Sequence, residues 1–367
     1  MVFGPRGSAV GGGRRRILRI QLLALLPVTL AALVNCGYQY YQGMAFLPGF
    51  KGSDLRSRLA DFLSANPQTP GLYDYLVAGV SHVLPMLLLA LLVGGFWERI
   101  IAERRGRPME PGFMLVALLF VLLLPGAAAF SHIVFGMSCA IILGKGIFGG
   151  EGKSFVNPAL LGIAIVQVSY PAASALHPLW NGMAGYAGSD AIALYHRGGE
   201  EALGQVGIDA WSAFIGAIPG TLGTTSLFAI ALGAGLLLVT RVISWRLLAA
   251  QFIGLLLFAG LVVAFGEPSA DPRAMPVHWH LLLGSFAFGA VFIACDPVAS
   301  ACTNPGRWIQ GFLIAGLLVL IRVVNSTHPD AVIPVLLLVS LLAPLIDHAV
   351  IAWNIRQRAR RHVHGHV

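Results

Sequence analysis

Charged side chains are scarce in this sequence, and their scarcity excludes a soluble fold. Only 11% of the 367 residues are Asp, Glu, Lys or Arg, whereas 57% are hydrophobic and the mean hydropathy is +0.78. A soluble domain has roughly 25% charged residues. Because a membrane helix uses about 20 apolar residues, the chain has room for about ten such helices and for no sizeable soluble domain.

The short motifs of soluble enzymes are also missing. The sequence has no phosphate-binding loop, no GxSxG, no HExxH and no GxGxxG. Its four cysteines form no CxxC pair and lie in or beside apolar segments; they are Cys36, Cys139, Cys295 and Cys302. We therefore expect small buried hydrophobic side chains and no metal site. The alternative is an iron–sulfur cluster shared by Cys139 and Cys295, for which two thiolates are too few without a second chain.

Long hydrophobic runs are abundant. Most of them are hydrophobic on all faces, which is typical of lipid-embedded or buried helices. The sequence thus predicts an all-α integral membrane protein with about ten transmembrane helices. The runs are 17–35, 76–96, 113–130, 133–147, 157–170, 226–242, 247–265, 281–294, 309–323 and 332–351.

Arginines cluster at both ends of the chain and account for its net charge of +8. Basic residues that flank membrane helices mark the cytoplasmic side, so we expect two cytoplasmic termini in a bacterial inner membrane and no nucleic-acid partner. The first run is expected to be a retained helix, because no small-residue cleavage site follows it. The clusters are Arg6, Arg14, Arg15, Arg16 and Arg19 at the start, and Arg356, Arg358, Arg360 and Arg361 at the end.

One long connection, 171–225, lies outside on this topology and divides the runs into two sets of five. A loop of this length is usually functional or ordered by a partner. The predicted organisation is a basic N-terminus at 1–16, a first membrane repeat at 17–170, the outer loop at 171–225, a second repeat at 226–351 and a basic tail at 352–367.

A similar pair of short motifs occurs in each half. Gly149-Gly150 leads to Asn157-Pro158 in the first half, and Asp296-Pro297 leads to Asn304-Pro305 in the second. Paired Gly/Pro interruptions of short apolar segments indicate inverted repeats with broken helices. The simpler alternative is that each Asn-Pro starts a helix.

Few ionisable residues lie in or beside the predicted spans, and a charge there is a functional candidate because burying it in a bilayer is costly. Asp296 is the strongest candidate for an ion path, with Lys145 of the other half as its expected partner. Glu98, beside Arg99, is expected to be a solvated flank. The remaining candidates are His132, and Asp347 and His348 near the inner interface.

Several segments resemble the NqrB/RnfD family, which comprises the B subunit of the sodium-translocating NADH:quinone oxidoreductase and the D subunit of the Rnf electron transport complex. The likeness covers nearly the whole chain in order and is greater to the B subunit. The segments are GKGIFGG at 144–150 with FVNPAL at 155–160, IPGTLGTTS at 218–226, DPV at 296–298 with TN at 303–304 and IRVVN at 321–325, NCGYQ at 35–39, and APLID at 343–347.

The resemblance implies two inverted five-helix repeats, similar to urea transporters, within a multi-subunit complex. It implies electron transfer between flavin and quinone, coupled to movement of Na⁺ or H⁺. It also places a quinone near Gly149 and Gly150, where the missing side chains let a flat ring approach the backbone.

Two positions depart from the family pattern. The family's B subunit carries FMN esterified to the Thr of an SGAT motif, but the matching stretch here, GYAGSD at 185–190, has Asp190 at that position. A carboxylate cannot form the phosphoester, so we expect no covalent FMN; FMN or riboflavin is then held by hydrogen bonds and stacking. At Thr224 the family has Glu. These losses leave two other functions open, a channel or transporter without redox chemistry and an anchor that docks redox proteins on the 171–225 loop.

Overall fold

The computed structural model describes residues 9–46, 55–63, 70–150, 152–154, 156–170, 191–265, 275–324 and 330–364, and these ranges contain helices and no strand. The helices of the first half are α1 (Ala9–Phe46), α2 (Leu55–Leu63), α3 (Leu72–Arg104), α4 (Phe113–Leu122), α5 (Phe130–Ile141) and α6 (Pro158–Ser169). Those that follow are α8 (Ala191–Gln205), α9 (Ala210–Ile215), α10 (Leu227–Val239), α11 (Trp245–Phe265), α12 (Val277–Leu282), α13 (Phe286–Phe288), α14 (Asn304–Val324) and α15 (Val332–His364). Two π-helical segments, η1 (Ile142–Gly146) and η2 (Gly289–Ala294), continue α5 and α13.

The predicted all-α membrane class is confirmed. Within the described ranges, five helices (α1, α3, α11, α14 and α15) are long and apolar enough to cross a membrane. Shorter apolar helices occupy most of the other predicted runs. The run at 113–130 is helical only to Leu122, because Pro125 lacks an N–H and restricts the residue before it. The run at 281–294 is divided at Gly284, whose φ of +78° breaks the helical path.

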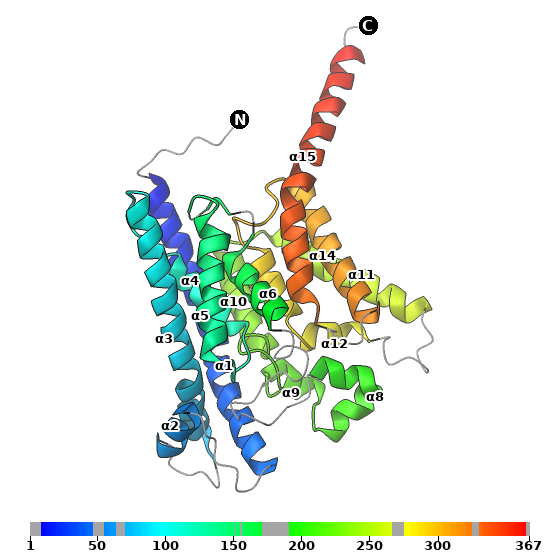
Figure 1. Ribbon diagram of the computed structural model, residues 1–367. Helices are drawn as coiled ribbons and strands as arrows, with labels where there is room; N and C mark the ends of the chain where they lie inside the picture. Colours follow the sequence, from blue (N-terminus) through cyan, green and yellow to red (C-terminus); the bar gives the residue numbers. More distant parts are fainter. Residues whose placement is uncertain are drawn as a thin grey trace.

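Helix α1 begins and helix α15 ends at the same end of the molecule (Figure 1). There α1 begins beside Arg14, Arg15 and Arg16, and α15 continues past Arg356, so we call it the basic end. Helices α2, α8 and α9 lie at the opposite end (Figure 1). The terminal helices extend further than the apolar runs, so parts of the predicted basic N-terminus and tail are helical.

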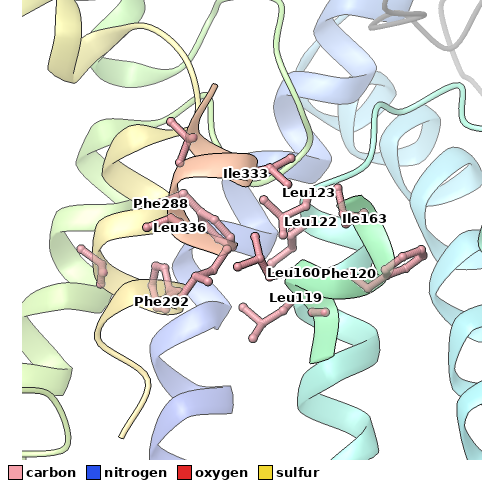
Figure 2. Packing of buried hydrophobic residues seen from close by; sticks show 14 of the residues in the cluster. Leu119, Phe120, Leu122, Leu123, Leu160, Ile163, Phe288, Phe292, Ile333 and Leu336 are labelled. Carbon is pink, nitrogen blue, oxygen red and sulfur yellow. The ribbon is translucent and has the colours of Figure 1, made fainter. Parts of the chain in front are cut away.

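The main core lies where the two halves meet (Figure 2). Leu119 and Phe120 of α4 and Leu160 of α6 pack in one cluster with Phe288 of α13 and Leu336 of α15. Burial of such large apolar side chains against complementary shapes, rather than helix propensity, fixes how short helices such as α4 and α6 are placed.

Helices α1 and α3 touch backbone to backbone. A Cβ at Gly37 of α1 would lie 1.9 Å from the Tyr75 carbonyl oxygen of α3, and one at Gly79 of α3 would lie 1.9 Å from the Leu33 carbonyl oxygen of α1. Small residues of this kind let membrane helices approach closely and gain van der Waals contact. These two glycines are therefore required by packing.

At the end opposite the basic end, α8, α9 and α12 form a cap with its own core, which includes Ile192, Tyr195 and Trp279. The described part of the 171–225 loop is thus helical and packed. Arg322, near the end of α14 and 1% exposed, joins the cap to the membrane part. Its Nη1 donates to the His280 carbonyl oxygen at 3.0 Å and its Nη2 to that of Leu283 at 3.2 Å, while the Asp330 carboxylate lies 3.7 Å away.

Candidate functional site

Lys145 lies in the π-helical segment η1 and is buried in an ionic cluster near the basic end. Its Nζ is 2.9 Å from Oε1 of Glu98 on α3 and 3.5 Å from Oε2 of Glu110 in the α3–α4 connection. Only 4% of the Lys145 side chain and 6% of the Glu98 side chain are exposed. The prediction that Glu98 is a solvated flank is therefore wrong, because α5 and η1 pack on α3 and cover this face of the helix.

Asp296 follows η2 and contacts the other half of the protein. Nδ2 of Asn157 donates to its Oδ2 at 3.0 Å. The same asparagine caps α6, since its Oδ1 accepts from the Ala159 amide at 3.0 Å and Pro158 occupies the first helical position. The prediction that Lys145 is the partner of Asp296 is wrong, because the Lys145 ammonium group forms ion pairs with Glu98 and Glu110. The corresponding motifs of the two halves are nonetheless in contact, through the hydrogen bond between Asn157 and Asp296.

Two small cavities adjoin the end of η2. One is lined by Gln21, Cys295 and Asp296 among apolar residues. The other is lined by Asn157, Gln310 and Ser340, also among apolar residues. Asp296 lines the first cavity, and its hydrogen-bond partner Asn157 lines the second. Carboxylate and amide oxygens are ligands that suit a cation, so Asp296 stays the leading candidate for the ion path.

Asp347 on α15 has a structural role in the fold. Its carboxylate accepts from the Cys302 amide at 2.6 Å and the Thr303 amide at 3.0 Å, and also from the Thr303 hydroxyl. It therefore fixes the turn before α14. His348 is exposed, and the His132 ring packs on the Tyr170 ring with centroids 4.3 Å apart.

Gly149 and Gly150 form the turn after η1, with φ values of +103° and +111°. A Cβ at Gly150 would lie 3.5 Å from Oε2 of Glu110, so the turn borders the cluster around Lys145. Positive φ alone accounts for both glycines. A quinone at this turn stays a prediction.

The four cysteines are free. Among the described residues, no group of three or more His, Cys, Asp or Glu side chains is arranged to hold a metal ion. Asp190 and the rest of 185–190 lie outside the described residues. Thr224 is buried, and its hydroxyl lies 2.7 Å from that of Thr221 in the segment that pairs with Leu122 at the end of α4.

Comparison with known proteins decides the family. The sequence pattern of the NQR2, RnfD, RnfE family matches residues 13–356. The chain belongs to this family. The resemblance indicated by its motifs is thus confirmed.

Curated relatives of the NQR2, RnfD, RnfE family align with 95% of the chain. A protein of Chromohalobacter salexigens is 38% identical over 348 residues, or 84% of the relative's length. Proteins of Ectopseudomonas mendocina and Azotobacter vinelandii are 38% and 37% identical over 350 and 355 residues, each 87% of the relative's length. All three are named as the B subunit of Na(+)-translocating NADH-quinone reductase.

Sequence reasoning missed several polar residues of this family member. Glu110 contributes to the Lys145 cluster although it lies outside every apolar run. Gln251 is fully buried on α11; its Nε2 is 3.8 Å from the Cys295 sulfur, and its Oε1 has no hydrogen-bond partner among the described residues. A glutamine inside the run 247–265 is the signal that could have found it, since a polar side chain in a span requires partners.

Proposed function

We propose that this chain is the membrane subunit of an ion-translocating NADH:quinone oxidoreductase complex, where it passes electrons between flavin and quinone while Na⁺ or H⁺ crosses the membrane. The observation that carries the proposal is the alignment of 95% of the chain with relatives named as the B subunit of such a reductase. Its partners are then the other subunits, a quinone and the lipid bilayer. The helices long and apolar enough to cross a membrane support this placement.

Purification of the tagged chain from its native membrane in mild detergent tests the proposal. We expect co-eluting subunits and NADH oxidation that depends on added quinone. A stable single chain without flavin and without quinone-dependent activity contradicts it. Solute flux through proteoliposomes that contain this chain alone, with no electron donor, would instead support the channel or transporter alternative.

The ion path is proposed to pass Asp296. This carboxylate lines one small cavity and accepts a hydrogen bond from Asn157 of the other half, which lines a second. Asp296→Asn removes the charge at nearly constant size, so we expect the ion-dependent rate to fall about tenfold or more, roughly 1.4 kcal/mol or above. Ion uptake by proteoliposomes of the intact complex measures it. Glu103→Gln, which removes an exposed carboxylate on α3, is the matched control; equal rates in both variants would remove Asp296 from the path.

The acceptor position for covalent FMN does not fit that group, so no step is assigned to a flavin there. Asp190 offers no hydroxyl oxygen to bond phosphorus and repels the phosphate dianion. We predict a non-fluorescent band under ultraviolet light after denaturing electrophoresis of protein made in a host with the flavin transferase. Fluorescence together with a phosphoryl-flavin mass on a peptide covering 185–195 would overturn this.

Two inverted five-helix repeats remain our proposal for the topology, with both termini cytoplasmic and 171–225 outside. The common location of α1's start and α15's end supports it (Figure 1). Ser189→Cys should react with an impermeant thiol reagent on intact cells, whereas Gly365→Cys should react only after permeabilisation. Labelling of the tail in sealed cells is the result that contradicts this topology.

A further inference from the structure

Three arginines and two tryptophans lie at the starts of α11 and α14, which pack together, and in the turn that precedes α11. Arg241 lies in the α10–α11 turn, Trp245 and Arg246 begin α11, and Arg307 and Trp308 lie in the first turn of α14. We call these five residues the Arg–Trp patch. The Trp245 and Trp308 rings are 6.4 Å apart, edge to face, and the Arg246 guanidinium lies 5.2 Å from the Trp245 ring centre. These contacts join the starts of α11 and α14 through Trp245, Arg246 and Trp308.

The positive charge of the patch is not neutralised within the described part of the chain. No carboxylate there lies within 4.0 Å of a guanidinium nitrogen of Arg241, Arg246 or Arg307. Arg246 donates to the neutral Asn304 Oδ1 at 3.0 Å, and Arg307 donates to the Ala301 carbonyl oxygen at 3.0 Å. The neighbouring Asp347 is occupied by the amides of Cys302 and Thr303.

Apolar surface continues from the patch along the same two helices. Trp245 is 58% exposed, and Leu256 further along α11 is 65% exposed. On α14, Ile309 and Leu320 are 49% and 56% exposed. Arginine at the level of the headgroups, tryptophan at the interface and apolar side chains beneath them match the layers of a phospholipid.

We propose that the Arg–Trp patch binds the phosphate of an anionic phospholipid whose acyl chains lie along α11 and α14. Guanidinium groups form charge-assisted hydrogen bonds with phosphate oxygens. The exposed apolar side chains along α11 and α14 favour a lipid over free phosphate, because free phosphate has no acyl chains to pack against them. This inference needs only the membrane location and is independent of the redox role.

Native mass spectrometry of the detergent-purified chain tests the proposal with phosphatidylglycerol, phosphatidylcholine of equal chain length, and inorganic phosphate. We expect retention of phosphatidylglycerol, little retention of phosphatidylcholine, and no displacement by millimolar phosphate. Arg246→Gln/Arg307→Gln should weaken phosphatidylglycerol binding roughly 30-fold. Arg356→Gln/Arg358→Gln removes the same charge from exposed positions on α15 and should change binding less than about twofold.

Three results would overturn the proposal: equal losses in the two double variants, equal retention of both lipids, or displacement by inorganic phosphate, which would indicate a simple anion site. If the double variant does not fold, Arg241→Gln replaces it. The Arg241 side chain makes no hydrogen bond or ion pair to other described residues, so its replacement should leave folding intact and weaken lipid binding roughly fivefold. Unchanged binding in folded Arg241→Gln counts against the patch.

Discussion

Replacement of Lys145 by methionine is expected to lower the free energy of unfolding by about 3–5 kcal/mol. The change leaves the Glu98 carboxylate, only 6% exposed, without the ammonium group 2.9 Å away. A charge in that position is stabilised only while its partner is present. The midpoint of thermal unfolding, followed by circular dichroism in one detergent, measures the loss.

The double variant Glu98→Gln/Lys145→Met is the informative control. It removes both charges, so we expect it to recover most of the stability lost in Lys145→Met. Arg99→Gln breaks an exposed pair with Glu103, whose side chains are 77% and 65% exposed, and should change the midpoint little. If Lys145→Met unfolds at the same temperature as Arg99→Gln, the buried pair does not stabilise the fold.

Replacement of Arg322 by methionine is expected to destabilise the protein by about 3–5 kcal/mol, mainly at the cap. The carbonyl oxygens of His280 and Leu283 lose their donors, and the Asp330 carboxylate loses its counter-charge. Limited trypsin digestion reports this locally, because Arg197 is exposed on α8. Cleavage after Arg197, identified by fragment mass, should become much faster in the variant.

Arg322→Lys separates charge from geometry. Lysine keeps the positive charge but has no planar fork to reach both carbonyl oxygens, so we expect an intermediate rate of cleavage. Cleavage after Arg197 at the wild-type rate in Arg322→Met would mean that the cap is held by its apolar core alone.

Apolar runs located the membrane helices because lipid requires each spanning segment to be hydrophobic and internally hydrogen-bonded. Their ends were less predictable, since polar residues continue a helix into water, as in α15 up to His364. Helices α2, α8 and α9 were missed because they carry no long apolar run.

The side-chain pairs of the candidate site could not be predicted from the sequence. Glu98 and Lys145 are 47 positions apart, and Asn157 and Asp296 are 139 positions apart. Each pair forms because helix packing brings its members together, and no local periodicity encodes that. The prediction of Asp296 as a functional candidate rested on a local fact, a charge beside a broken apolar segment, and needed no knowledge of its partner.

The backbone contact between α1 and α3 has a mechanical consequence. At Gly37 and Gly79 the two backbones are in direct contact, so at these two points no side chain can change rotamer and let the helices slide past one another. We expect α1 and α3 to move as one rigid body. A movement that accompanies ion passage would then have its hinge elsewhere. We expect it at the π-helical segments 142–146 and 289–294, because their hydrogen bonding departs from the α-helical pattern.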